Sequence, residues 1–223
     1  MVSVISSVPP ARRRLIRDVR PIIKSTADTM KRLIALLFAF TSSFNVIAAD
    51  TPFICSISAE KATITQGELP RVKVSITNKS GKDVHLVGSL DGSDVGWRFP
   101  KCGFELLDTA GKPVPQKQPM GRCGNMNKLK TTDFVKVAAG AEFNPFGQGF
   151  FGSWQLYRFK QLPPGTYIFR FYYQTSTKGV QDYFGDERMM GQKTVAPEIQ
   201  KLFEAVSLID IKSNDLQITV QPE

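Results

Sequence analysis

The sequence contains a single histidine, His85, among its 223 residues. Ser-His-Asp and Cys-His catalytic arrangements need a histidine as the base, and no serine here stands in the Gly-x-Ser-x-Gly context of a hydrolase nucleophile. His85 lies in the stretch "DVHLVG" among apolar neighbours, which is typical of a structural or surface position in a strand. The sequence therefore argues against both of these hydrolase classes.

Motifs for metals and phosphates are missing as well. The only cysteines are Cys55, Cys102 and Cys123, and together with the one histidine they match none of the usual zinc spacings. GxxxxGK[ST] does not occur, and the one GxGxxG match, "GQGFFG" at 147–152, is not predicted to open a helix. We expect no metal site and no cofactor.

The net charge of +9 is concentrated at the N-terminus. Residues 1–49 carry eight basic and two acidic side chains, which leaves a net charge of +3 for residues 50–223. A nucleic-acid-binding domain has a strong basic patch, and this part of the chain shows none in its composition. We expect no nucleic-acid partner.

Residues 30–49 have the order of a secretory signal peptide. Met30 is followed by Lys31 and Arg32, then by the apolar run 33–40, a polar patch and the small pair Ala48–Ala49. Cleavage after Ala48 or Ala49 fits this pattern. An uncleaved anchor helix is the alternative, but the apolar run is shorter than the ~18–20 residues of a membrane span. The mature protein is predicted to have no span and to be periplasmic or secreted.

Residues 1–29 do not fit this export pattern. The stretch "ARRRLIR" has some likeness to a twin-arginine motif, but "DVRPIIKSTADT" follows it where an apolar region belongs. Because Met30 alone opens a complete signal, we interpret 1–29 as an over-extended N-terminus and 50–223 as a single domain.

Three cysteines in an exported domain allow one disulfide and one remaining thiol. Cys102 and Cys123 are the better pair, because each stands beside a glycine in a loop-like stretch and the segment between them reads as a hairpin. Closing such a loop stabilises a fold by ~3 kcal/mol. Cys55, in the alternating stretch "FICSIS", is predicted to be a buried thiol in an early strand.

From residue 51 onward the sequence has the two-residue period of β-strands. "RVKVSITN" alternates strictly, and "GTYIFRFYYQTS" places Tyr167, Phe169, Phe171 and Tyr173 on one face. Shorter strands are predicted at "VHLVG", "FELLD", "DFVKVAAG" and "SNDLQITV", with a short helix at "VAPEIQKLFEAV". Many short strands separated by turns predict an all-β protein, a β-sandwich with one short helix near the C-terminus.

The stretches "GELPRVKVSITNKSGKDV", "LPPGTYIFRFYY" and "SNDLQITV" resemble the immunoglobulin-like β-sandwiches of exported bacterial proteins of uncharacterised function. A looser resemblance extends to sandwich domains of bacterial proteinase inhibitors and metallopeptidase propeptides. These are fold motifs without catalytic residues, so the resemblance implies an immunoglobulin-like fold and an exported location, and it implies no mechanism.

The stretch "LDGSDVGWRFPKCGFE" gathers many reactive residue types. Asp91 and Asp94 could hold a cation, but the third acidic position and the distal glutamate of an EF-hand are missing, so a turn is the better interpretation. A hydrolytic carboxylate pair could be drawn from Asp91, Asp94, Glu105 and Asp108, if they met in one cleft. The preferred interpretation is a pinned crossover in which Trp97 packs.

Aromatic residues are concentrated at 143–159. The stretch "GFFGSW" does not alternate like a strand, so its aromatic side chains either cover an open end of the sandwich or form an exposed binding surface. If they are exposed, the polar loop "RCGNMNKL" lies near them. The candidate binding residues are Trp97, Phe150, Phe151, Trp154, Arg122 and Asn125.

The sequence thus predicts a non-catalytic exported module. It binds a protein, a peptide or an envelope component through its end loops, as exposed aromatics on loops are typical of such surfaces. The alternative is a carbohydrate-binding or carboxylate-dependent hydrolytic protein that uses the Asp91–Asp108 region and the aromatics at 150–157.

Overall fold

The computed structural model describes residues 52–115, 127–147, 149–185 and 194–223. All of them belong to one compact unit, Ala48–Glu223. The predicted export signal, the predicted over-extended N-terminus, and the candidate residues Arg122, Cys123 and Asn125 lie outside the described residues.

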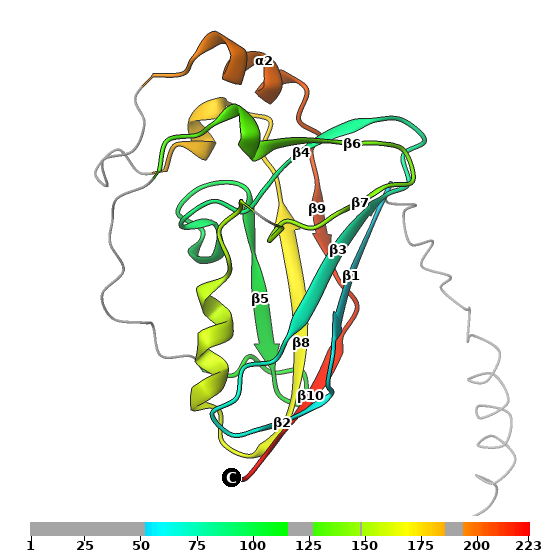
Figure 1. Cartoon of the computed structure of the whole chain (residues 1–223), viewed down its shortest axis with the longest axis vertical. Helices are drawn as coiled ribbons and strands as arrows, with labels where there is room; N and C mark the ends of the chain where they lie inside the picture. Colours follow the sequence, from blue (N-terminus) through cyan, green and yellow to red (C-terminus); the bar gives the residue numbers. More distant parts are fainter. Residues whose placement is uncertain (1–51, 116–126, 148, 186–193) are drawn as a thin grey trace, which may run out of the picture. The chain divides into compact units, whose positions relative to one another are not determined.

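Two β-sheets dominate this unit (Figure 1). The first has the strand order β1-β3-β7, formed by Phe53–Ala59, Val72–Asn78 and Glu142–Phe143, and all its pairs are antiparallel. The second has the order β2-β10-β8-β5, and β9 also pairs with β8. Its strands are Thr63–Thr65, Leu216–Gln221, Gly165–Gln174, Lys101–Leu107 and Asp210–Lys212. Only the β2–β10 pair is parallel.

The remaining elements are short. Strands β4 (Val84–Val87) and β6 (Phe134–Val137) form a separate antiparallel pair. The described 3₁₀ helices are η1 (Ser93–Val95), η2 (Thr131–Asp133), η3 (Trp154–Gln161) and η4 (Val180–Tyr183). The α-helix α2 (Pro197–Glu204) lies within the stretch where a helix was predicted, and Pro197 occupies its first turn.

The main core is formed by the facing sides of the two sheets. Along β8 every second residue is buried, so Tyr167, Phe169, Phe171 and Tyr173 all point inward, as the two-residue period predicted. They meet Ile57 of β1 and Ile76 of β3 from the other sheet in one apolar cluster. A structure that is mostly strand, with two sheets around one core, is compatible with the predicted all-β sandwich.

A second apolar cluster lies under α2. The helix buries Ile199 and Phe203 against Tyr183, Val87 and neighbouring residues. The hydroxyl of Tyr183 donates to the backbone carbonyl of Ser176 (2.9 Å) and accepts from its N–H (3.0 Å). This buried tyrosine therefore fixes the path of the chain from the end of β8 to η4.

Strands β9 and β10 are separated by a bulge against β8. Lys212 pairs with Tyr172 and Leu216 with Phe169, so three residues, 213–215, stand opposite two on β8. One extra residue in this place is the definition of a β-bulge, which bends a strand and redirects its side chains. The sequence prediction of one continuous strand over "SNDLQITV" was wrong at this bulge, because Ser, Asn and Asp leave the regular ladder here.

The bulge closes the outer edge of β1. Asn214 accepts a hydrogen bond from the backbone N–H of Ile57 (2.9 Å) and donates one to its carbonyl (3.1 Å). A side-chain amide thus satisfies both backbone groups of an edge residue and ties the two sheets together.

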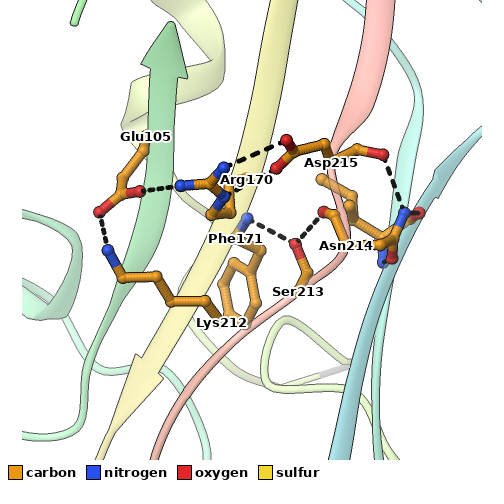
Figure 2. Close-up of polar contacts among 8 residues, drawn as sticks. Glu105, Arg170, Phe171, Lys212, Ser213, Asn214 and Asp215 are labelled. Atoms are coloured by element: carbon orange, nitrogen blue, oxygen red, sulfur yellow. Dashed lines mark hydrogen bonds and ion pairs between the residues drawn. The ribbon is translucent and has the colours of Figure 1, made fainter. Parts of the chain in front are cut away.

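Charged side chains cover the bulge on the outer face of the second sheet (Figure 2). Arg170 binds Asp215 with two nitrogens, at 2.7 and 3.1 Å, and lies 3.7 Å from Glu105. Glu105 also accepts a hydrogen bond from Lys212 (2.6 Å). The two positive and two negative charges balance within one network, so this face carries no net charge from them.

Candidate functional site

An apolar pocket of about 490 Å³ opens between the two sheets beside η3. Its volume falls within the range of about 300–1,000 Å³ that ligand pockets occupy. One wall comes from the segment that leads into β3, the opposite wall from η3, and the floor from β5 and the chain after β7. The lining residues are Leu69, Pro70, Val72, Phe104, Phe146, Phe151, Gly152, Ser153, Leu156 and Tyr157.

Stacked aromatic rings form the floor of this pocket. Phe104 and Phe146 are stacked with ring centroids 5.8 Å apart, and each lies 5.5 Å from Phe171 of the core. The floor is therefore continuous with the main core, and a side chain that enters the pocket reaches the space between the sheets. No aspartate, glutamate, lysine or arginine lines it among the described residues. The pocket thus favours an uncharged apolar group.

The rim contains two exposed aromatic side chains. Phe151 is 40% exposed and Tyr157 is 56% exposed. Phe151 is therefore exposed, which is one of the two arrangements that the sequence left open, whereas its neighbour Phe150 points the other way. The Phe150 ring packs against Gly88, where a Cβ atom would collide with it, and meets Phe143 edge-on at 6.3 Å. Of these two candidate binding residues, Phe150 therefore packs against the core and Phe151 lies at the surface.

Helix η3 forms the wall that sequence reasoning missed. Ser153 precedes it and accepts a hydrogen bond from the N–H of Gln155 (3.2 Å), which is the N-cap arrangement. A serine before "WQLYRFKQ" was the available signal, but the aromatic residues of this stretch suggested irregular structure. Trp154 begins the helix, and its side chain lies outside what the structure describes.

Gln155 attaches η3 to the edge of β5. Its amide oxygen accepts from the N–H of Phe104, and its amide nitrogen donates to the carbonyl of Asp94 (2.7 Å). Gly103 leaves room for this contact, because a Cβ atom there would collide with the amide oxygen of Gln155. The free edge of β5 is thereby capped, and the wall of the pocket is held in place.

The edge of β3 on the opposite side of the pocket is not capped in this way. Asn214 takes both backbone groups of Ile57, so Val74, which stands opposite Ile57, turns its own N–H and carbonyl away from β1. In an antiparallel ladder the direction of the backbone groups repeats every second residue, so the N–H and carbonyl groups of Val72 and Ile76 also point away from β1. Ile76 meets β7, but β7 has only two residues and does not reach Val72.

β7 ends because the chain turns immediately after it. Asn144 accepts hydrogen bonds from the N–H groups of Phe146 (2.9 Å) and Gly147 (3.0 Å), which is the turn chemistry of an Asn-Pro pair. Within the described ranges, no backbone hydrogen bond satisfies the groups of Val72 on this edge. Val72 is half-buried and lines the pocket. The pocket therefore contains an unpaired strand edge as well as apolar side chains.

Trp97 does not belong to this pocket. It is half-buried, and its ring lies against Gly92, with 3.2 Å between the ring and the position a Cβ atom would take. It lines a shallower hollow of about 330 Å³ together with Phe99, Lys101 and Asp182. Trp97 and Phe151 were both candidate binding residues, and the structure places them in two separate hollows.

The carboxylates of the Asp91–Asp108 region belong to separate networks. Asp91 pairs with the buried guanidinium of Arg98 and accepts from the N–H of Asn127 (2.6 Å). Glu105 belongs to the charged network on the outer sheet face. Asp108 accepts from Ala110 (2.9 Å) and Lys112 (2.8 Å) in its own turn. None of them lines the apolar pocket.

The buried side chain of Arg98 fixes the path of the stretch "LDGSDVGWRFPKCGFE", which crosses over between strands. Its side chain is 1% exposed, and it also donates to the carbonyls of Asp91 (3.0 Å) and Asn127 (2.7 Å). Burial lowers the pKa of Arg98 to about 10, while the charge of Asp133 partly offsets this effect. The ordinary pKa of arginine is so high that the side chain keeps its charge at neutral pH. A further hydrogen bond to the carbonyl of Tyr183 (3.4 Å) joins this loop and the chain at Asn127 to η4.

Two cysteines are described, Cys55 and Cys102; both are buried, and they form no disulfide with each other. Burial raises the pKa of Cys55 to about 12 and has the same effect on Cys102. Cys102 lies within β5, with no exposed surface, rather than in a loop. Its predicted partner Cys123 lies outside the described residues, so their pairing stays a prediction.

No protein-family model matches the chain, and no curated protein matches it either. Among the described residues, no cluster of three or more His, Cys, Asp or Glu side chains could hold a metal ion. In the same part of the chain, no helix is long and apolar enough to cross a membrane.

Proposed function

We propose that the protein is a non-catalytic, exported binding module with an immunoglobulin-like β-sandwich. It binds a protein, a peptide or an envelope component in the periplasm or outside the cell, and the apolar pocket beside η3 is the site. The observation that carries the proposal is the exposure of Phe151 and Tyr157 at the rim of a pocket that leads to the core. Exposed aromatics around a concave apolar surface are typical of binding sites.

One local contact supports the immunoglobulin-like part of the proposal. The hydroxyl of Tyr167, near the start of β8, donates to the carbonyl of Pro163 four residues upstream (2.9 Å). This is the geometry of the tyrosine corner, which occurs in many sandwiches of that class. Export is supported by the signal-like order of residues 30–49.

Two observations disfavour the alternatives. Among the described side chains, Phe150 packs inward, so it does not extend the exposed rim toward the broad flat platform that a glycan would need. The candidate carboxylates Asp91, Glu105 and Asp108 are engaged in separate networks, whereas a glycosidase pair faces one cleft.

A pull-down from cell-envelope extract tests the proposal. The double variant Phe151→Ala/Tyr157→Ala removes the exposed rim, and Ile54→Ala/Leu208→Ala is its matched control, because Ile54 and Leu208 are also exposed but do not line the pocket. We expect a partner that the unaltered protein and the control retain and the rim variant loses. Failure to capture any partner, or equal capture by both variants, would contradict the proposal.

A further inference from the structure

The pocket combines two features that an extended peptide needs. One is an apolar cavity without charged lining, and the other is the unpaired edge of β3 at Val72. A strand edge with free N–H and carbonyl groups is a template for pairing with another chain. Most proteins block such edges, and this protein blocks two others, with Asn214 at β1 and Gln155 at β5.

We propose that the pocket binds an extended peptide segment, which adds a strand to β3 beyond the end of β7 and inserts an apolar side chain between the sheets. The inference rests on the proposed function, since it names the kind of partner that the same site takes. Peptides are bound in this way elsewhere, where main-chain hydrogen bonds supply affinity and pockets for alternate side chains supply specificity.

Strand geometry determines which side chain enters. The backbone groups of Val72 point to the open edge, so one peptide residue opposite Val72 exchanges both hydrogen bonds with it. Residues that stand opposite each other in a ladder place their side chains on the same face. Val72 shares its face with Val74 and Ile76, whose side chains are buried in the core. The peptide residue opposite Val72 therefore points inward, above Phe104 and Phe146.

The lining fixes the chemistry of that side chain. Its surroundings are Leu69, Phe104, Phe146 and Leu156, so an aliphatic or aromatic side chain fits and a charged one would be desolvated without a partner. The adjoining peptide residues point to solvent, because side chains alternate along a strand. The expected ligand is a short extended peptide with one central apolar residue and polar neighbours.

The test uses a displayed library of random linear twelve-residue peptides, selected against the full chain. We expect enriched peptides that contain an apolar residue and lose at least tenfold in affinity for the Val72→Pro variant. Proline removes the N–H of Val72, which makes no bond to β1, so the β1–β3 ladder keeps its hydrogen bonds. The control Leu208→Ala changes an exposed residue outside the pocket and should bind within threefold of the unaltered protein.

A second measurement does not depend on how the proline variant folds. Each enriched peptide is N-methylated at one position at a time and tested against the unaltered protein. An added strand turns alternate N–H groups toward β3, so methylation should abolish binding at every second position around the apolar residue and be tolerated between them. A scan without this alternation would overturn the inference.

Two further outcomes would also overturn it. One is the absence of any enriched peptide, including the case in which the pocket takes up palmitate and is a lipid site. The other is an envelope partner whose capture depends on Phe151 and Tyr157 but is unchanged by Val72→Pro. In this last case the proposed function would stand and only the strand-addition inference would fail.

Discussion

The strand edges on the two flanks of the sandwich differ in whether their backbone groups are hydrogen-bonded. On one flank, Asn214 binds both backbone groups of Ile57, and the charged residues around Arg170 cover the bulge that supplies it. On the other flank, β7 stops after two residues, the edge of β3 at Val72 stays unpaired, and an apolar pocket lies beside it. We call the first the closed flank and the second the open flank.

This difference separates stability from binding. On the closed flank, polar side chains form hydrogen bonds with the backbone. Replacing these side chains should therefore lower the free energy of unfolding. On the open flank, Phe151 and Tyr157 are exposed and contribute little to the core, so their loss should affect binding and leave the fold intact.

Asn214→Ala should lower the free energy of unfolding by about 3 kcal/mol, because the N–H and the carbonyl of Ile57 both lose their partner. Urea denaturation followed by circular dichroism measures the change. Asp215→Asn is the control on the next residue, where the side chain is exposed, and it should change stability by less than about 1 kcal/mol. Equal effects of the two variants would show that Asn214 does not close the edge.

Gly103→Ala should lower the free energy of unfolding by about 2 kcal/mol, because the new methyl group collides with Gln155 and displaces it from β5. Thermal unfolding is a suitable readout. Gly152→Ala is the matched control, since a Cβ atom at this pocket residue meets nothing within 4 Å. If both variants unfold at the same temperature, Gln155 does not hold η3 against the sheet.

Alkaline pH should weaken the fold through Cys55 on β1. Burial raises the pKa of this thiol from 9.0 to about 12, so the folded state holds its proton at a pH where the unfolded chain has lost it. The contribution is fully present below pH 9 and is lost as the pH rises toward 12, with about 1 kcal/mol gone by pH 10. Denaturation curves at pH 8, 9 and 10 measure it.

Cys55→Ala removes this titration and serves as the comparison for the alkaline series. Its stability should decline less between pH 8 and pH 10 than that of the unaltered protein. Parallel declines in the two proteins would mean that Cys55 ionises as readily in the folded state as in the unfolded chain.

Arg170→Gln should have the smallest effect, a loss of at most about 1 kcal/mol, because its ion pairs with Asp215 and Glu105 lie at the surface. The loss should shrink further in 1 M salt, which screens exposed charges. Chemical denaturation at low and high salt checks both statements. A loss of several kcal/mol would mean that the network, rather than Asn214, holds the closed flank together.

The parts of the fold that follow a strong period could be predicted. The alternation of β3 and β8 is visible in the sequence because each strand has one face in the core, and α2 is visible through the spacing of Ile199 and Phe203. Strands β2 and β7 are only three and two residues long, too short to show a period. The bulge at 213–215 depends on pairing with β8, which no local pattern records.

The site could be predicted only in part for the same reason. The sequence identified the aromatic stretch at 150–157, but Phe150 and Phe151 are chemically identical, and only packing against Gly88 distinguishes them. The opposite wall, Leu69 to Val72, lies about 80 residues away in the chain and carries no binding motif. Long-range packing of ordinary apolar residues creates the pocket, so composition alone could not reveal it.

Two quantities measured on two variants test most directly whether the closed flank serves stability and the open flank serves binding. Affinity for the partner captured from envelope extract and the free energy of unfolding are determined for Phe151→Ala/Tyr157→Ala and for Asn214→Ala. We expect that the first variant loses binding and changes stability by less than about 1 kcal/mol, whereas the second loses about 3 kcal/mol and still binds when folded. If Asn214→Ala abolishes binding while folded, or the rim variant binds normally, the separation between the open and the closed flank is wrong.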